Sequence, residues 1–443
     1  MNQDFMKEKP ILPLVISMAL PMSISMLVNA LYNIIDSYFV ARISEDTMTA
    51  LSLVYPIQNA VNSVAVGFGI GINAAIAYYL GAKNRQLANR AASVGIFLNV
   101  IHGILLTIVS MVIMPMFLRL FTKDEQIITS ALDYSYIVFA FCIPIMASVS
   151  LEKIFQAVGQ MKTSMVCMLI GCVVNIILDP VLIFGIGFLP RLGIRGAAIA
   201  TGIGQVASLV AYIVIYFVRP IPVKITRKDI KFEKKLCKKL YLIGMPATLN
   251  MALPSLQVSA LNGILSVYSV SYVLVLGAYY KLQTFLYLTA NGVVQGMRPI
   301  IGYNYGAGEM KRVNKIFKTA LEIIVVVMKI GTVLCMSMPQ HLIGLFSKQT
   351  STIEIGCTTL RIIAIGFIVS SVSVTASGAL EGLGKGMESL MISILRYIAV
   401  MLSLAYVFSM LIGVNGVWHA FWVTEAITAI ISFCIYKKTI KNV

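Results

Sequence analysis

Hydrophobic residues form long runs along the whole chain, and short polar segments separate these runs. A run of about 20 apolar residues is long enough to cross a bilayer as an α-helix. The runs lack the alternation of apolar and polar residues that membrane β-strands carry, so we predict helices. Twelve segments are expected, at residues 13–38, 47–73, 90–117, 129–150, 163–187, 196–218, 239–260, 269–291, 316–337, 355–377, 389–411 and 415–436.

Short motifs recur in the same order in the two halves of the chain, mostly at a spacing of 225. The pairs are Ala19-Leu20-Pro21 with Gly244-Met245-Pro246, Tyr79-Leu80-Gly81-Ala82 with Asn304-Tyr305-Gly306-Ala307, and Phe155-Gln156-Ala157-Val158-Gly159-Gln160 with Leu380-Glu381-Gly382-Leu383-Gly384-Lys385. Near the end the spacing becomes 220, as in Gly193-Ile194-Arg195-Gly196 and Gly413-Val414-Asn415-Gly416. The order of the pairs indicates a duplicated six-helix unit, and an even number of helices makes it a parallel repeat.

The predicted fold class is therefore an all-α polytopic membrane protein with twelve transmembrane helices in two pseudo-symmetric six-helix bundles. We expect an N-terminal lobe at 1–218, a basic cytoplasmic linker at 219–239 and a C-terminal lobe at 240–443. The composition agrees, because 58% of residues are hydrophobic and 12% are charged, about half the charged fraction of a soluble domain.

The net charge of +17 raises the question of nucleic acid, but its distribution argues against that partner. Most Lys and Arg residues fall in the loops of one side when the N-terminus is placed in the cytoplasm. This is the positive-inside pattern of membrane proteins. We therefore expect a multi-pass protein of the cell membrane with both termini cytoplasmic, and a linker at 219–239 that faces anionic lipid.

Two aspartates lie inside apolar runs, Asp36 in the first segment and Asp179 in the fifth. An ionisable group at bilayer depth costs about 3 kcal/mol, so it usually faces a cavity and handles an ion or a proton. Asn175 precedes Asp179 by one helical turn and shares its face. Pro180 cannot donate an N–H and disrupts the bond to the carbonyl of Ile176, which leaves that oxygen free beside the acid.

Other residues could complete or adjust this site. Tyr32 lies one turn before Asp36 and is either a cavity residue or packing. Thr201 offers a hydroxyl that either joins the site or bonds back to its own helix, and Ala197, one turn earlier, offers only its carbonyl. Pro21 lies inside the first segment and predicts a bend there.

The ordered motifs resemble those of the multidrug and toxic compound extrusion (MATE) family, closest to its bacterial DinF-like and MepA-like branch. They are Leu31-Tyr32-Asn33-Ile34-Ile35-Asp36, Gly159-Gln160-Met161-Lys162, Asn175-Ile176-Ile177-Leu178-Asp179-Pro180, Gly196-Ala197-Ala198-Ile199-Ala200-Thr201, Pro299-Ile300-Ile301-Gly302-Tyr303-Asn304-Tyr305-Gly306-Ala307 and Gly413-Val414-Asn415-Gly416-Val417-Trp418. The likeness covers nearly the whole chain. It implies a secondary antiporter, not an enzyme, that exports organic cations or amphipathic compounds in exchange for inward H⁺ or Na⁺ by alternating access of two lobes.

The resemblance also implies an ion-coupling site formed by Asp36, Asn175, Asp179, Ala197 and Thr201. Na⁺ would be held by Asp36, Asn175, Asp179 and Thr201, because hard cations prefer oxygen ligands. Two adjacent carboxyl groups can also share a proton, so the same oxygens serve H⁺ or Na⁺. It further implies that the bend at Pro21 changes when Asp36 is protonated.

The second copy lacks these polar residues. At a spacing of 225, Asp36 corresponds to Leu261, Asn175 to Val400 and Asp179 to Leu404. The predicted ion site is therefore confined to the N-terminal lobe.

Lys281 stands alone in a long uncharged stretch of the C-terminal lobe. It either faces a cavity there, or it pairs with an acid or reaches the interface. Lys281 and Arg396 keep a rival function open, a flippase for lipid-linked oligosaccharides or lipid II of the same superfamily. An ion channel is the alternative from another class. No cofactor is expected beyond the coupling ion, and we expect a monomer whose partners are small molecules and the bilayer.

Overall fold

The computed structural model describes residues 4–185 and 190–441. The last two residues of the predicted segment 163–187 lie outside the described residues. The described chain consists of helices and their connections, with no β-strand in these two ranges. The predicted all-α class is confirmed.

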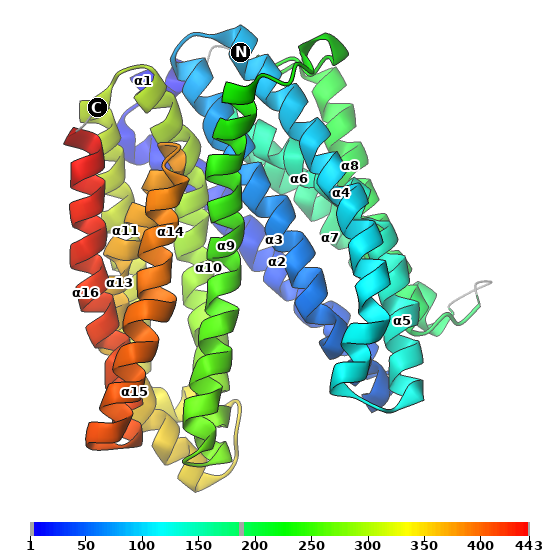
Figure 1. Cartoon of the computed structure of the whole chain (residues 1–443), viewed down its shortest axis with the longest axis vertical. Coiled ribbons are helices and arrows are strands. Elements are labelled where there is room, and N and C mark those ends of the chain that lie inside the picture. Colours follow the sequence, from blue (N-terminus) through cyan, green and yellow to red (C-terminus); the bar gives the residue numbers. More distant parts are fainter. Residues whose placement is uncertain (1–3, 186–189, 442–443) are drawn as a thin grey trace. The chain divides into compact units, whose positions relative to one another are not determined.

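Helices of the first copy follow each other with short connections (Figure 1). They are α1 (Phe5–Glu8), α2 (Ile11–Ala41), α3 (Glu45–Gly81), α4 (Arg85–Phe121), α5 (Glu125–Ala140), α6 (Cys142–Ala157), α7 (Met161–Phe184) and α8 (Ile194–Val218). The connections carry helix-start residues, since Ser44, Asn84 and Asp124 each accept a hydrogen bond from a backbone N–H of the next helix. Such caps satisfy N–H groups that the helix itself leaves unpaired.

Helices of the second copy repeat this order. After the short helix η1 (Arg227–Asp229) of the linker they are α9 (Lys234–Ser266), α10 (Val270–Gly306), α11 (Met310–Ser337), α12 (Pro339–Gly344), α13 (Thr350–Gly382), α14 (Gly386–Ile394), η2 (Leu395–Ala399), α15 (Val400–Ile412) and α16 (Val414–Lys441). The predicted segment 389–411 falls on α14, η2 and α15, where η2 is a π-helical turn inside one span.

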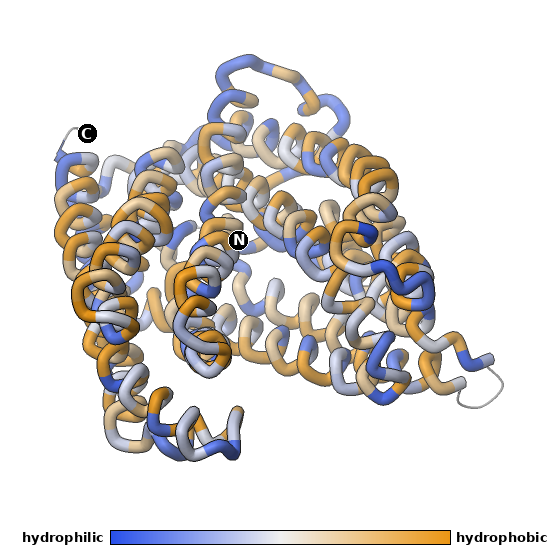
Figure 2. Tube along the Cα trace, turned by 60° about the horizontal axis from the view of Figure 1, so that its bottom comes forward, coloured by the Kyte–Doolittle hydropathy of each residue, from blue (hydrophilic) through white to orange (hydrophobic). Residues whose placement is uncertain are grey.

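Nine helices of the described chain are long and apolar enough to cross a membrane, or ten if the bent pair α5 and α6 is one span. The pair bends by 47° between Ala140 and Cys142, within the predicted segment 129–150. Helices α9 and α10 are as long, with 33 and 37 residues, but more polar side chains interrupt them. In Figure 2 hydrophobic residues follow most of each helix and hydrophilic ones gather in the connections.

The chain divides into two compact units that do not simply follow the order of the helices. Unit 1 is Ile24–Thr248, and unit 2 combines Asp4–Ser23 with Leu249–Val443. Helices α2 and α9 therefore contribute their first part to one unit and their remainder to the other. The two division points, after Ser23 and after Thr248, have the same spacing as the sequence repeat.

The first part of α9, which belongs to unit 1, and the first part of α2, which belongs to unit 2, are each held by a close contact with a glycine. In unit 1 a Cβ on Gly67 of α3 would lie 2.3 Å from Thr248 Oγ1 of α9, and in unit 2 a Cβ on Gly292 of α10 would lie 2.2 Å from Ser23 Oγ of α2. Only glycine permits backbones to approach this closely. Gly67 and Gly292 are themselves related by the repeat spacing of 225, so the duplication extends to the packing contacts.

The basic linker is ordered against the start of α4 in unit 1. The backbone N–H groups of Lys224 and Thr226 donate to Asn89 Oδ1 (2.8 Å) and Ser93 Oγ (3.1 Å). Helix α9 begins at Lys234, so the last six residues of the predicted linker 219–239 are helical. The helix therefore begins five residues before the predicted segment 239–260. The division of the chain into lobes at 218 and 240 stays a prediction.

Candidate functional site

The two buried aspartates lie together in unit 1. Asp36 on α2 is 8% exposed and Asp179 on α7 is fully buried. Their carboxyl groups are in hydrogen-bonding contact. Two carboxyl groups can share a hydrogen bond only when one of them carries a proton, so this contact is suited to holding one.

Asn175 links the acids to the next helix. Its amide nitrogen lies 3.4 Å from Asp179 Oδ1, one turn along α7. The same nitrogen lies 3.4 Å from Thr201 Oγ1 on α8. All three side chains are buried, so the amide holds a carboxylate and a hydroxyl in fixed positions away from bulk water.

Three buried oxygen atoms of this group have no hydrogen-bond donor in the described part of the chain. They are Asp36 Oδ1, Asn175 Oδ1 and Asp179 Oδ2. A buried acceptor without a partner is costly. An oxygen-rich group of this kind is satisfied by a proton or by a hard cation such as Na⁺.

A cavity of about 40 Å³ lies beside the group and connects α2, α7 and α8. This is room for roughly two or three water molecules. Tyr32, Asn175 and Thr201 line it, and so do several residues that the sequence did not single out: Asn29, Met168, Gly171, Cys172, Gly204, Gln205 and Ser208. Gln205 follows Thr201 by one turn, a spacing from which it could have been predicted.

Small residues bring α7 and α8 close enough for these contacts. A Cβ on Gly171 would lie 2.8 Å from the carbonyl oxygen of Gly204, and a Cβ on Gly204 would lie 2.8 Å from the carbonyl oxygen of Gly171. This close approach sets Asn175, one turn after Gly171, opposite Thr201.

Two tyrosines add hydroxyl groups. Tyr32 is hydrogen-bonded to Thr201, so it joins the polar group instead of packing only. Tyr134 of α5 is 2% exposed and forms a hydrogen bond with Gln58. Nothing in the sequence pattern distinguished Tyr134 from other aromatic residues.

The remaining predicted site residues are less directly placed. Ala197 is fully buried on α8, one turn before Thr201. Pro180 lies inside α7, which continues to Phe184. Pro21 lies inside α2, two residues before the chain passes from unit 2 to unit 1.

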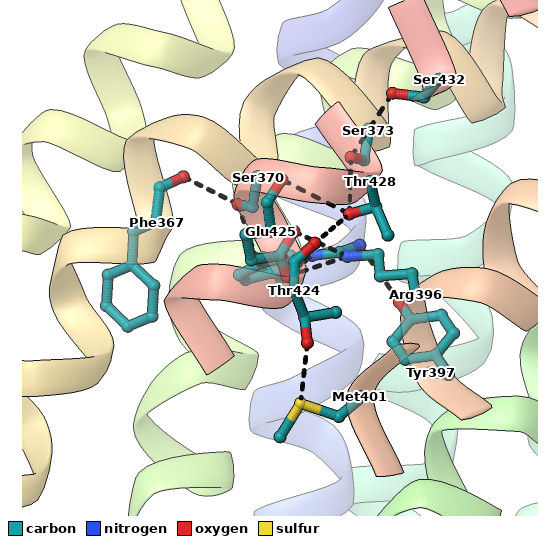
Figure 3. Close-up of polar contacts among 11 residues, drawn as sticks. Phe367, Ser370, Ser373, Arg396, Tyr397, Met401, Thr424, Glu425, Thr428 and Ser432 are labelled. Atoms are coloured by element: carbon teal, nitrogen blue, oxygen red, sulfur yellow. Dashed lines mark hydrogen bonds and ion pairs between the residues drawn. The ribbon is translucent and has the colours of Figure 1, made fainter. Parts of the chain in front are cut away.

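Lys281 and Arg396 lie in unit 2 and differ in their surroundings. Lys281 is exposed on α10, and its Nζ lies 5.8 Å from the centre of the Phe346 ring. Arg396 is 7% exposed and forms an ion pair with Glu425 of α16 (Figure 3). The guanidinium is therefore already neutralised.

Comparison with known proteins identifies the family. The MatE family model matches the chain twice, over residues 21–181 and 246–407, and the starts of the two matches are related by the repeat spacing. The multidrug export protein MepA of Staphylococcus aureus (strain NCTC 8325 / PS 47) is 26% identical over 440 residues, which cover 97% of this chain and 94% of the relative. MepA of Staphylococcus saprophyticus subsp. saprophyticus is 25% identical over 94% of this chain and 91% of the relative.

Solved structures share the fold over its whole length. A crystal structure of MATE in the bent conformation has a TM-score of 0.93 at 23% identity, covering 100% of this chain and 98% of that one. A MOP superfamily transporter from Pyrococcus furiosus Vc1 (DSM3638) has a TM-score of 0.92 at 22% identity, with the same coverage. Both family matches lie on the repeated helices, and together they span well over half of the chain, so this protein belongs to the MATE family of membrane transporters.

Proposed function

We propose that the protein is a secondary antiporter that exports organic cations or amphipathic compounds in exchange for inward H⁺ or Na⁺. The observation that carries this proposal is the group of three buried oxygens of Asp36, Asn175 and Asp179, which have no donor among the described residues. The name of the staphylococcal relatives, multidrug export protein, supports the direction and the class of cargo.

The coupling ion binds among Asp36, Asn175, Asp179 and Thr201, with Ala197 behind Thr201 on α8. A proton is held between the two carboxyl groups, and Na⁺ is held by the same oxygens. Helix α2 begins in unit 2 and continues into unit 1 after Ser23. An ion that binds at Asp36 therefore acts on a helix whose first part belongs to unit 2. Ion binding then favours the conformation that releases cargo outside, which is how one ligand drives another across a two-state protein. A bend of α2 near Pro21 is the proposed response.

The protein works as a monomer in the cell membrane with both termini in the cytoplasm. The distribution of Lys and Arg supports this orientation. Within unit 2, Met6 and Tyr436 both contact the start of α11, since Arg312 Nε donates to the carbonyl of Met6, and Tyr436 donates to Asn314 Oδ1. The ion pair of Arg396 with Glu425 leaves that guanidinium neutralised, which weakens the case for a pyrophosphate flippase.

The test is exchange by proteoliposomes that carry Asp36→Asn. With an imposed H⁺ or Na⁺ gradient, wild-type vesicles accumulate a fluorescent organic cation against its gradient, and the variant does not. Asp46→Asn is the matched control, because Asp46 is exposed in the first turn of α3. Ion-driven accumulation by Asp36→Asn at the wild-type rate would overturn the assignment.

A further inference from the structure

Unit 2 holds a charged cluster that the proposed ion site does not use. Arg396 of η2 donates from Nε to both carboxylate oxygens of Glu425 (2.9 and 3.0 Å) and from Nη2 to Oε1 (2.7 Å). Its other bonds go to the hydroxyls of Tyr287 (3.0 Å) and Tyr397 (3.3 Å). Figure 3 shows the guanidinium of Arg396 directed at the carboxylate of Glu425.

The surroundings of the guanidinium have the composition of a cation-binding cage. The rings of Tyr287 and Tyr397 lie 5.7 and 5.3 Å from its central carbon, within the range of cation–π attraction. Glu425 supplies the balancing negative charge. Tyr287 is itself oriented by a hydrogen bond from its hydroxyl to Ser370 Oγ (2.7 Å), so the cage is built from α10, α13, η2 and α16.

The backbone at Arg396 is specialised. Leu395–Ala399 form a π-helical turn between two α-helical stretches. Such turns are rare and are frequently found at functional sites. The turn also adds a residue relative to a regular helix, so the repeat spacing beyond it is 226 and Asp179 corresponds to Ala405 instead of Leu404. Leu404 and Ala405 are both apolar, so unit 2 has no carboxyl group at the position of Asp179 with either spacing.

The sequence repeat relates the cluster to the cavity of unit 1. At the spacing of 225 before the turn, Arg396 corresponds to Gly171, and at the final spacing of 220, Glu425 corresponds to Gln205. Gly171 and Gln205 both line the unit 1 cavity. At the positions that line the cavity in unit 1, unit 2 therefore has an arginine and the glutamate that pairs with it.

We propose that unit 2 contains a cation site, formed by Glu425, Tyr287 and Tyr397, which the chain keeps filled with its own Arg396 side chain. Without that side chain the cage accepts a free planar cation of the guanidinium class. The bidentate geometry of Glu425 selects a planar donor over a spherical ion. The side chain of Glu425 is 16% exposed and that of Arg396 is 7% exposed. A small cation therefore enters the cage on the Glu425 side. Where coupling follows the proposed function, the filled cage leaves the coupling ion to unit 1.

The test measures binding to the full-length protein in detergent. It requires no transport, so its outcome does not depend on whether the proposed function is correct. Arg396→Ala empties the cage. Millimolar guanidinium chloride is expected to raise the unfolding temperature of this variant saturably, by a few degrees, as a ligand of the folded state does. Wild type gains nothing, because its cage is full. Urea, a neutral molecule of the same shape, and NaCl are the matched controls.

Arg396→Ala/Glu425→Gln decides whether any shift belongs to this site. Loss of the guanidinium effect in the double variant supports the proposal, whereas its persistence, or its absence in folded Arg396→Ala, overturns it. Arg396→Met is the second variant if alanine leaves the protein unfolded, because methionine fills the space of the arginine stem. If neither variant folds unaided, recovery in guanidinium but not in urea supports the cage, and equal failure in both contradicts it.

Discussion

The amide nitrogen of Asn175 lies 3.4 Å from the hydroxyl oxygen of Thr201, and this contact joins α7 to α8 beside the two buried acids. The same nitrogen reaches Asp179 at 3.4 Å, while the amide oxygen has no donor among the described residues. One side chain therefore orients a carboxylate and offers an oxygen to the ion. The consequences of this arrangement can be measured.

Replacing Asn175 with alanine is expected to weaken Na⁺ binding without unfolding the protein. The variant lacks the amide oxygen that is free to bind the cation, so the Na⁺ concentration for half-maximal transport should rise roughly 10- to 100-fold, whereas the H⁺ concentration should not rise, because the lost N–H group favoured the ionised form of Asp179. Titration of transport in proteoliposomes measures it. Asn33→Ala is the control, since Asn33 is exposed on α2 and bonds only within that helix. An unchanged ion dependence in Asn175→Ala would exclude Asn175 as a ligand.

Alanine at Gly67 and at Gly292 should destabilise the protein to a similar extent. The new Cβ would collide with the backbone and hydroxyl of Thr248 in the first case and of Ser23 in the second. Overpacking of this kind costs about 1–3 kcal/mol. Thermal unfolding in detergent compares them with Gly277→Ala on α10, which has no neighbouring atom within 4 Å. Three equal melting temperatures would show that the repeated contact contributes nothing.

Low pH should loosen the N-terminal segment from the rest of unit 2. Lys7 of α1 lies 2.9 Å from Glu309, and its charge holds the pKa of Glu309 below the usual range. A carboxyl group with a lowered pKa stabilises the folded contact above its ordinary pKa and loses this contribution as the pH falls through the lowered value. The protection of the α1 amides against hydrogen exchange, taken relative to the intrinsic exchange rate at each pH, should therefore fall in acid.

Glu309→Gln removes this pH dependence and makes exchange in α1 faster at neutral pH as well. The hydrogen bond from Asn304 to the carbonyl of Met6, at 3.0 Å, remains in both proteins and keeps the segment in place. Glu322→Gln, an exposed change on α11 away from the contact, is the control. Acid-dependent exchange that survives in Glu309→Gln would assign the effect to another group.

Much of the fold follows from the sequence, because long apolar runs and a repeat with a spacing of 225 are visible without coordinates. The proximity of Asp36 and Asp179 was also predictable, since two isolated acids in apolar segments each need a polar neighbour. The assignment of the first parts of α2 and α9 to the other unit could not be predicted, because an apolar run does not show which helices each half of it packs against. The 47° bend between α5 and α6 has a cause in the sequence that the prediction of one segment at 129–150 did not use, because Pro144 cannot donate a hydrogen bond to the carbonyl of Ala140, the last residue of α5.

The charged residues of the second copy show the same limit. Arg396 and Glu425 lie 29 positions apart on different helices, and helical periodicity relates only residues on one helix. Arg396 corresponds to Gly171 in the first copy, so the repeat itself gives no sign of a charged residue there, and the π-helical turn that carries Arg396 changes the register of the residues after it.

The central claim is that Asp36 and Asp179 form one ion site. A double-mutant cycle in proteoliposomes tests it, with ion-driven uptake measured for Asp36→Asn, Asp179→Asn and the double variant against wild type. Groups that act as one unit are strongly non-additive. The account predicts that each single change abolishes ion-driven uptake and that the double variant is no worse than either. Partial losses that multiply in the double variant, or ion-driven uptake retained by it, would contradict a shared site.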